Sequence, residues 1–451
     1  MSFEQLGLSS ALLDAINDQG YSQPSPIQEK AIPIVLKHQD LLAAAQTGTG
    51  KTAAFVLPIL ELLSTKPPAS SNHTKVLIIA PTRELAQQIS DNILVYGQNL
   101  PLRSTVVYGG VKINPQMMKL RKGVDLLVAT PGRLLDLYQQ NAIAFDELEI
   151  LVLDEADRML DMGFIHDIRR IIQLLPKQRQ NLLFSATFSN EIRELSKTIV
   201  HQPVEVSVTP KNTTAKTVKQ WIHPVDKKQK TRLLVYLIRE KQLHQVLVFC
   251  RTKHGANRLV RDLEAEKIKS LAIHGNKSQN ARLNALNSFK QGKIQILVAT
   301  DIAARGIDIE QLPYVINFDL PHVPEDYVHR IGRTGRAGMD GHAISLVSAD
   351  EFKQLSDIER LTQKLLERVF VDGFDPVHTL PVSVLRKPYK PKKPKKNKQE
   401  YHDGQRSQNA SAHQLKQQNK QKPNSKRRNK PNTSAGNSMR KKFRIKPKRS
   451  Q

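Results

Sequence analysis

The sequence contains a single cysteine, one tryptophan and no long apolar stretch. One cysteine excludes an internal disulfide framework and a zinc site built from several thiolates, as expected in a reducing compartment. Cys250 lies in the apolar run QVLVFC, which favours a buried structural thiol over a reactive one. No segment reaches the roughly 18 apolar residues of a membrane span, and the N-terminus lacks a signal-peptide pattern. We therefore expect a cytosolic protein without a membrane contact.

Acidic residues are scarce in one part of the chain. Residues 386–451 hold 23 Lys and Arg against 2 Asp and Glu, which is +21 of the net charge of +27. This stretch has almost no apolar residue to bury, so we predict a disordered basic tail over 381–451. Cations that pair with phosphates release condensed counterions, which favours polyanion binding by the tail. A passive solubilising extension is the alternative.

Short β-branched runs, each followed by a helix-compatible stretch, predict buried parallel strands in an α/β fold. The runs are KVLIIA (75–80), DLLVAT (125–130), ILVLDE (150–155), NLLFSAT (181–187), QVLVFC (245–250) and QILVAT (295–300). The first and fifth runs lie 170 residues apart, and so do the second and sixth. This shared offset indicates a duplicated domain, joined near the polar stretch 209–219.

Only the first copy contains a phosphate-binding pattern. AQTGTGKT follows the strand-like DLLAAA and precedes the helix-forming AAFVLPILELL. Glycines let backbone N–H groups approach phosphate oxygens, Lys51 supplies a cation for the β- and γ-phosphates, and Thr52 can hold Mg²⁺. We predict a nucleotide site formed by Ala45, Gln46, Thr47, Gly48, Thr49, Gly50, Lys51 and Thr52, with Ala45 standing where the pattern has its first glycine.

An acidic pair follows the strand-like run LVL. Asp154 is predicted to hold Mg²⁺ and Glu155 to polarise the water that attacks the nucleotide. A charged loop is the alternative, but the position after a strand and downstream of the phosphate loop favours a catalytic pair.

The second copy carries three arginines at three-residue spacing in HRIGRTGRAG (329–338). Arg330, Arg333 and Arg336 would share one face of a helical turn. Exposed arginines usually form a solvated surface. In a copy without its own phosphate loop, we expect them instead to reach the nucleotide on the first copy, where such arginine fingers contribute about 10³ to 10⁵ in rate.

Taken together, the motifs resemble those of the DEAD-box RNA helicases over about residues 1–380. In order they are Phe3 with GYSQPSPIQ (20–28), AQTGTGKT (45–52), PTRELA (81–86), GG (109–110), TPGR (130–133), DEAD (154–157), SAT (185–187), ATDIAARGID (299–308) and HRIGRTGR (329–336). GGVKINPQMMKL and the basic tail are most similar to the bacterial RhlE-type branch.

The resemblance implies two tandem RecA-like domains of the P-loop helicase superfamily 2 core. The implied limits are 1–30 for a glutamine-motif segment, 31–208 for the ATP-binding domain, 209–219 for the linker, 220–380 for the C-terminal domain and 381–451 for the tail. It also implies an RNA-stimulated ATPase that uses ATP and Mg²⁺ to clamp RNA and open short duplexes. Ribosome assembly or RNA turnover, with ribosomal particles or RNA-decay proteins as partners, is the implied setting.

The resemblance further assigns roles to single residues. Gln28 would read adenine with Tyr21 and Phe3 near the base, and Asp308 would hold the ribose. Coupling of hydrolysis to strand separation would fall to Ser185, Thr187 and His329. RNA would lie on Arg83, Gly110, Thr130, Arg133 and Thr300. Asn276 stands where the family usually has Asp, which leaves one RNA contact of the second copy open, and Ser25 replaces the usual Thr.

Two other functions stay open from the sequence. A translocating DNA helicase would use the same two-domain plan, although the DEAD sequence and Gln28 argue against it. An RNA annealing or tethering protein would depend on the tail, with an incidental ATPase. Tail deletion separates this second reading from the helicase.

Overall fold

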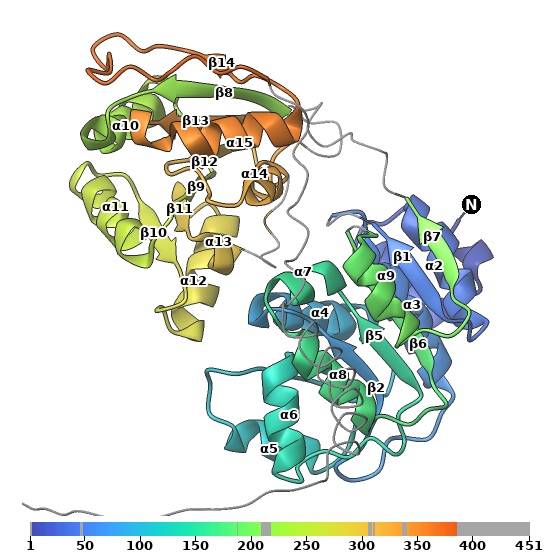
Figure 1. The fold of residues 1–451 in the computed structure, drawn as a ribbon. Coiled ribbons are helices and arrows are strands. Elements are labelled where there is room, and N and C mark those ends of the chain that lie inside the picture. Colours follow the sequence, from blue (N-terminus) through green and yellow to red (C-terminus); the bar gives the residue numbers. More distant parts are fainter. Residues whose placement is uncertain are drawn as a thin grey trace, which may run out of the picture. The chain divides into compact units, whose positions relative to one another are not determined.

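The structure is a computed structural model that describes residues 2–45, 48–186, 188–208, 218–304, 309, 312–335 and 341–385. The described chain forms two α/β halves, each built on one parallel sheet (Figure 1). The predicted tail from residue 386, and residues 209–217 of the predicted linker, lie outside the described residues. Within the described ranges, no helix is long and apolar enough to cross a membrane.

The first half runs from the N-terminus to the join between the two copies. Its elements are η1 (Glu4–Leu6), α1 (Ser10–Asp18), α2 (Pro26–Leu36), β1 (Leu41–Ala44), α3 (Lys51–Ser64), β2 (Thr74–Ile79), α4 (Arg83–Tyr96), β3 (Ser104–Val107), α5 (Asn114–Leu120), β4 (Val124–Ala129), α6 (Pro131–Gln139), β5 (Ile150–Leu153), α7 (Ala156–Asp161), α8 (Ile165–Leu174), β6 (Gln180–Ser185), α9 (Asn190–Lys197) and β7 (Val204–Ser207).

The second half repeats this alternation of strands and helices. Its elements are β8 (Val218–Pro224), η2 (Lys227–Gln229), α10 (Lys230–Glu240), β9 (Val246–Phe249), α11 (Lys253–Ala265), β10 (Ser270–Ile273), α12 (Gln279–Lys290), β11 (Ile296–Ala299), α13 (Asp301–Ala304), β12 (Tyr314–Asn317), α14 (Pro324–Ile331), β13 (Gly341–Val347), η3 (Ala349–Glu351), α15 (Phe352–Thr362) and β14 (Glu367–Arg368).

The two sheets have matching strand orders. The first is β3-β4-β2-β5-β6-β1-β7 and the second is β10-β11-β9-β12-β13-β8-β14. Every strand of the first sheet therefore has a counterpart at the same position in the second, and β2 and β4 correspond to β9 and β11, whose sequences lie 170 residues downstream. The duplication predicted from the repeated runs is confirmed.

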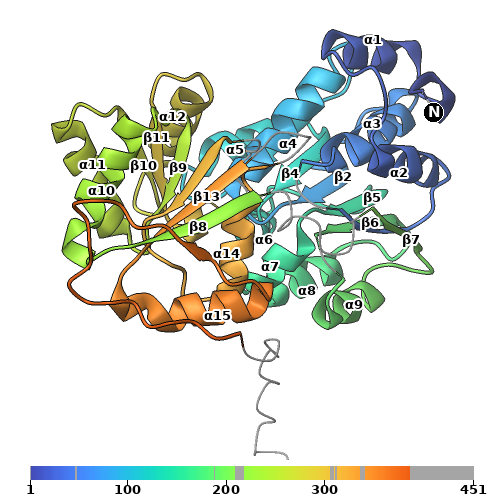
Figure 2. The same cartoon turned by 90° about the horizontal axis from the view of Figure 1, so that it is seen from above.

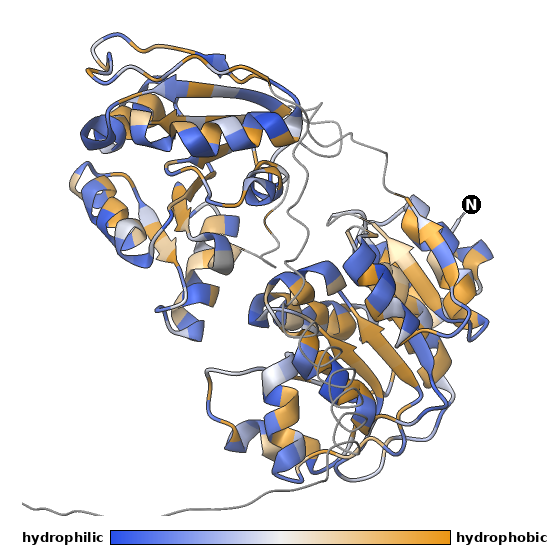
Figure 3. Ribbon diagram, viewed as in Figure 1, coloured by the Kyte–Doolittle hydropathy of each residue, from blue (hydrophilic) through white to orange (hydrophobic). Residues whose placement is uncertain are grey.

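Both faces of each sheet are covered by helices, which explains the continuous apolar runs of the central strands. In the first half, α2, α3 and α4 cover one face and α7, α8 and α9 the other (Figure 2). The arrows of β2 and β5 are coloured as hydrophobic in Figure 3, and every residue of both strands is buried. Because these strands are held in the core, they fix the positions of the loops that follow them.

All six predicted strand runs are strands, although each one ends before the last residue of its run. The trailing residues, such as Asp154 and Thr300, belong to the loops or helices that follow. The predicted domain limits differ slightly from the elements. Helix α2 crosses the boundary at residue 30, and β8 begins at Val218, inside the predicted linker.

Candidate nucleotide-binding and catalytic site

The predicted site residues gather at one edge of each sheet. In parallel sheets all carboxyl ends of the strands meet at the same edge, where ligands bind in open α/β folds. In the first half, the phosphate loop follows β1, Arg83 begins the helix after β2, and Asp154 directly follows β5. In the second half, Thr300 follows β11. In each half, residues from motifs that are far apart in the sequence are therefore brought together by the strand ends, so that even short side chains can reach a common ligand.

The phosphate loop is shaped by glycines with left-handed backbones. Gly48 has φ 79° and Gly50 has φ 87°, values that other residues rarely adopt. A Cβ atom on Gly50 would lie 2.5 Å from Nε2 of Gln28, which donates a hydrogen bond to the Gly50 carbonyl at 3.1 Å. Gln28 also accepts a bond from the Ser25 backbone N–H at 2.8 Å. The predicted adenine-reading residue thus contacts the phosphate loop directly.

Lys51 is a buried cation whose amino group lacks a hydrogen-bond partner in the described residues. The residue is only 6% exposed. Burial of an ammonium group without a hydrogen-bond acceptor destabilises a protein. We therefore expect a bound anion to accept hydrogen bonds from Lys51. The orphan Nζ at the start of α3 fits the phosphates of a nucleotide, and the helix N-terminus adds to the attraction.

Two carboxylates stand next to this cation. Burial raises the pKa of Asp154 to about 6, with Lys51 opposing the shift and Glu155 adding to it. Burial would also raise the pKa of Glu155, but the positive charges of Arg158, Lys51 and Arg333 outweigh it and hold the pKa below its ordinary value. Glu155 therefore stays ionised, as a residue that polarises water requires, and its Oε2 accepts no hydrogen bond in the described residues.

The strand ends around the acidic pair are bonded to one another. The Asp157 carboxylate accepts a hydrogen bond from the backbone N–H of Ala186 at 3.0 Å. The N–H of Ala45 donates to the carbonyl of Ser185 at 2.9 Å. These bonds join the DEAD and SAT motifs and the phosphate loop. The sequence analysis gave Asp157 no role, and only its place within a named motif could have suggested one.

Three predicted RNA contacts of the first half lie together. Gly110 has φ 78°, and a Cβ there would overlap the Arg83 guanidinium, with 2.0 Å to Nη1. Arg133 donates to the carbonyl of Val111 at 3.0 Å. Arg83 and Arg133 are thus brought to the same glycine-containing turn, where their charges can meet a phosphate backbone.

The predicted pair of threonines occupies equivalent places in the two halves. Thr130 follows β4 and Thr300 follows β11, the two strands at matching positions of the sheets. Both are mostly buried, at 9% and 7% exposure. The two threonines are therefore equivalent in the duplicated fold, and their contact with RNA stays a prediction.

The expectation of three arginines on one helical face is wrong. Helix α14 ends at Ile331, because Gly332 and Gly335 follow, and only Arg330 lies within it. Arg330 is 2% exposed and forms a two-pronged ion pair with Asp301 at 2.5 and 2.7 Å. It therefore belongs to the core of its own half and does not act as a finger. Arg333 lies beyond the helix and contributes to the lowered pKa of Glu155.

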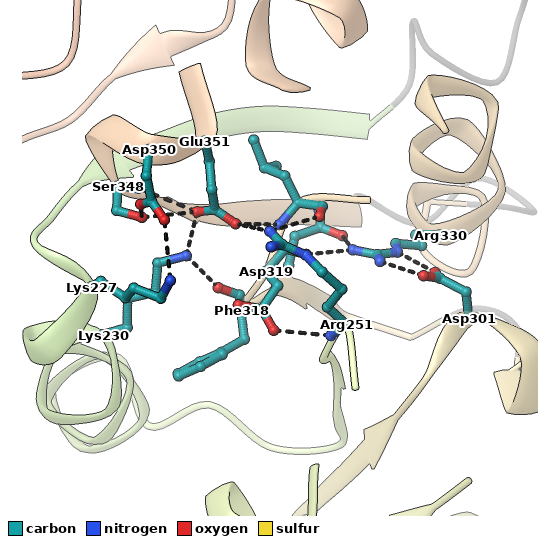
Figure 4. Close-up of polar contacts among 12 residues, drawn as sticks. Lys227, Lys230, Arg251, Asp301, Phe318, Asp319, Arg330, Ser348, Asp350 and Glu351 are labelled. Carbon is teal, nitrogen blue, oxygen red and sulfur yellow. Dashed lines mark hydrogen bonds and ion pairs between the residues drawn. The ribbon is translucent and has the colours of Figure 1, made fainter. Parts of the chain in front are cut away.

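Arg330 is the end of a polar network that crosses the second half (Figure 4). It also donates to the side chain of Asn317 at 3.0 Å and the carbonyl of Asp319 at 2.7 Å, and its guanidinium lies over the ring of Phe249. Asp301 immediately follows Thr300. Arg330 therefore ties the loop predicted to bind RNA to the helix that precedes Arg333.

The same network continues to Glu351 at the start of α15 (Figure 4). Glu351 accepts from Lys230 at 2.5 Å, from Arg251 at 2.6 Å and from the N–H of Leu320 at 3.1 Å. Arg251 in turn donates its N–H to the Asp319 side chain at 2.9 Å. A buried carboxylate with several donors thus fixes the segment after β12 that carries Arg330. Sequence patterns gave no sign of it.

A further charged cluster joins residues from both halves. The Glu84 carboxylate accepts from Gln279 at 2.8 Å and pairs with Arg282 at 3.0 Å. Glu84 belongs to PTRELA, and Gln279 and Arg282 begin α12. The sequence predicted no contact among these three residues, because Glu84 and Gln279 are 195 positions apart and neither motif shows which residue the other will meet.

The remaining predicted residues lie as follows. Phe3 is packed in the hydrophobic core of the first half, Tyr21 is 46% exposed beside Tyr96, and His329 is half-exposed near Asp326. Ser185 is fully buried at the end of β6, and Thr52 is the second residue of α3. Gln46, Thr47, Thr187, Asp308 and Arg336 lie outside the described residues.

Comparison with known proteins agrees with this geometry. The family model described as DEAD/DEAH box helicase matches residues 25–195, and the helicase conserved C-terminal domain matches residues 229–338. The chain is 42% identical over 373 residues to the ATP-dependent RNA helicase CshA of Listeria monocytogenes, covering 83% of this chain and 71% of the relative. It is also 42% identical over 360 residues to RhpA, a DEAD-box ATP-dependent RNA helicase of Helicobacter pylori, covering 80% and 72%.

A solved structure is similar over nearly the same extent. It is S. cerevisiae Dbp5 bound to RNA and ADP BeF3, at 33% identity and a TM-score of 0.73, covering 82% of this chain and 96% of that one. The tandem parallel sheets described above are therefore an arrangement that this relative shares.

Proposed function

The chain belongs to the DEAD-box family of ATP-dependent RNA helicases, and on that premise we propose how its residues divide the work of an RNA-stimulated ATPase. The observation that carries the proposal is the buried ammonium of Lys51, which lies beside two carboxylates and has no hydrogen-bond partner among the residues that the structure describes. Backbone N–H groups of residues 48–50 and the start of α3 bind the phosphates, and Lys51 neutralises them. Gln28 orients the base from its position against Gly50.

We propose that Thr52 and Asp154 would hold Mg²⁺ at this site. A hydroxyl, a carboxylate and phosphate oxygens are the hard oxygen ligands that this ion prefers. When bound, the ion supplies neutralisation of charge on the phosphates. Glu155, kept ionised by the surrounding cations, accepts a hydrogen bond from the attacking water and orients it.

The coupling of hydrolysis to RNA is proposed to run through the second half. Thr130 and Thr300 contact one RNA strand, together with Arg83, Gly110 and Arg133. Seating of Thr300 fixes Asp301 and hence Arg330, which positions the segment that carries Arg333. Arg333 and Arg336 then stabilise negative charge on the phosphates during hydrolysis. Ser185, Thr187 and His329 relay the state of the nucleotide to the RNA-binding loops, and Phe3, Tyr21 and Asp308 complete the nucleoside contacts.

We also propose the domain limits, the branch of the family and the cellular role of the chain. Domain limits of 1–30, 31–208, 209–219, 220–380 and 381–451 remain our assignment, with the basic tail as a second RNA contact. GGVKINPQMMKL and the tail favour the RhlE-type branch, whereas the relatives compared above carry the names CshA and RhpA. A cytoplasmic role in ribosome assembly or RNA turnover is proposed, and RNA-bound Dbp5 supports the choice of RNA as substrate.

Replacement of Lys51 tests the proposed nucleotide site. Lys51→Ala removes the cation from the phosphates, so RNA-stimulated ATP hydrolysis should fall to background. Lys75→Ala is a matched control, because Lys75 is also buried but pairs with Glu149 at 3.5 Å. The control should keep most of the ATPase rate. Hydrolysis by Lys51→Ala at the parent rate would show that this loop does not hold the reacting phosphates.

A further inference from the structure

Strand β3 forms an open edge of the first sheet and leads into the turn of Gly110 and Val111, next to the proposed RNA contacts. It pairs with β4 only. In a parallel ladder, alternate residues direct both backbone groups to the same neighbour. Bonds such as Asp125 N–H to the Arg103 carbonyl and Thr130 N–H to the Val107 carbonyl show that Arg103, Thr105 and Val107 face β4. Ser104, Val106 and Tyr108 therefore face outward.

The backbone groups of Tyr108 show which kind of partner an outward-facing residue of β3 can bind. The Tyr108 N–H donates to the Gln116 side-chain carbonyl at 3.1 Å, and its own carbonyl accepts from the Gln116 amide nitrogen at 3.2 Å. The Gln116 amide thus pairs with the strand edge as a peptide group of a neighbouring strand would. Within the described residues, no such partner pairs with the outward backbone groups of Val106 and Ser104.

A groove with a volume of about 390 Å³ runs along this edge between α4 and α5. That volume lies in the range of ligand-binding sites in proteins, which is roughly 300–1,000 Å³. Its apolar lining includes Leu94, which is 61% exposed, and Val111, at 36%. Its rim holds Lys112 and Lys119, both exposed and without an ion-pair partner in the described residues.

We propose that this edge groove binds an extended, acidic peptide segment of a partner protein, which adds as a strand beside β3. The backbone of such a segment supplies both donors and acceptors to Ser104 and Val106, continuing the pairing that Gln116 begins. Alternate side chains of the segment enter the apolar groove, and its carboxylates meet Lys112 and Lys119. The basic tail of this chain is excluded as occupant by charge.

RNA fits the groove less well. Phosphodiester oxygens can pair with the two lysines, but an RNA backbone does not present the alternating N–H donors and C=O acceptors that a neighbouring strand offers to Ser104 and Val106. A strand edge can also be protected from aggregation simply by nearby lysines, with no ligand at all. RNA binding and an edge that binds no ligand both predict experimental results that differ from those expected for peptide binding.

The test uses the full chain and a fluorescein-labelled octapeptide of alternating Glu and Val. We expect saturable binding, which raises fluorescence anisotropy, and slower hydrogen–deuterium exchange in residues 104–108. Val106→Pro removes the outward N–H without touching a bond to β4, and should weaken binding at least tenfold. The double change Lys112→Glu and Lys119→Glu should weaken it at least as much, whereas Lys122→Glu, an exposed lysine outside the groove, should not.

RNA-stimulated ATPase at saturating RNA should stay near the parent value in all three variants, which shows that each is folded. No saturable binding at millimolar peptide would overturn the proposal and leave the lysines as protection of the edge. Binding that is insensitive to Val106→Pro and to the charge reversals would also overturn it. Loss of RNA affinity in the lysine double variant, without peptide binding, would assign the groove to RNA instead.

Discussion

The buried carboxylate of Glu351 should stabilise the second half by several kcal/mol. Its side chain is 3% exposed, and that of its partner Lys230 is 2% exposed. Glu351→Gln removes the negative charge and leaves the Lys230 ammonium buried without a counter-charge. Removal of one partner from a buried ion pair typically costs about 3–5 kcal/mol. This is a large share of the roughly 5–15 kcal/mol that stabilises a typical protein.

Trp221, the only tryptophan in the chain, reports this effect directly. It lies on β8 in the same half, so its fluorescence in a urea titration follows unfolding of the structure that contains Glu351. We expect the midpoint to move to clearly lower urea in Glu351→Gln. The free energy of unfolding should fall by about 3–5 kcal/mol.

Two control variants distinguish the effect of leaving a buried charge unpaired from the effect of losing any acidic side chain. Asp350 is the neighbour of Glu351 and pairs with Lys227 at 3.1 Å, but both side chains are more than half exposed. Asp350→Asn should therefore cost less than about 1 kcal/mol. The double variant Lys230→Met and Glu351→Leu removes both charges of the buried pair. It should recover part of the stability lost in the single variant, because the remaining partner Arg251 is 28% exposed and can be solvated. A Glu351→Gln protein as stable as the parent would refute this reasoning, and so would a double variant less stable than the single one.

Four further predictions concern the catalytic cycle and the tail. Glu155→Gln should bind ATP and stay clamped on RNA without hydrolysis; single-turnover hydrolysis near the parent rate would remove its water-orienting role. Arg333→Ala should lower the RNA-stimulated turnover far more than ATP affinity, and equal losses in steady-state and binding assays would instead favour a contact made before RNA binds. The pKa of Asp154 is raised to about 6, chiefly by burial, and its ionised form is the proposed metal ligand, so in a pH–rate profile the ATPase rate should fall as the pH drops through about 6; a rate unchanged down to pH 5 would contradict this. Removal of residues 386–451 strips +21 of charge and should weaken RNA binding and flatten its salt dependence while sparing turnover at saturating RNA, whereas identical salt slopes would make the tail a passive extension.

The sequence predicted the fold well because the central strands are buried on both faces and therefore read as short apolar runs. Edge strands such as β3 and β14 are short and only partly buried, and were missed. The internal strands β12 and β13 of the second sheet were also missed, although they are largely buried. The duplication was visible because equivalent strands kept both their sequences and their spacing.

The phosphate loop and the acidic pair could be recognised because each occupies consecutive residues, and the structure surrounds Lys51 and Glu155 with the burial and charge that their proposed roles require. The prediction for Arg330 was wrong, because the spacing of arginines in a sequence does not show where a helix ends. It also does not show whether an arginine forms an ion pair within its own half, as Arg330 does with Asp301. The cluster around Glu351 joins it to Lys230 and Arg251, which lie 121 and 100 positions away, so only the fold reveals it.

The most direct test of the account is the rate of ATP hydrolysis by the full chain with RNA, with single-stranded DNA of the same sequence, and without nucleic acid. The account predicts slow hydrolysis alone, strong stimulation by RNA and little stimulation by DNA. Equal stimulation by DNA and RNA, or a rate that neither nucleic acid changes, would contradict it.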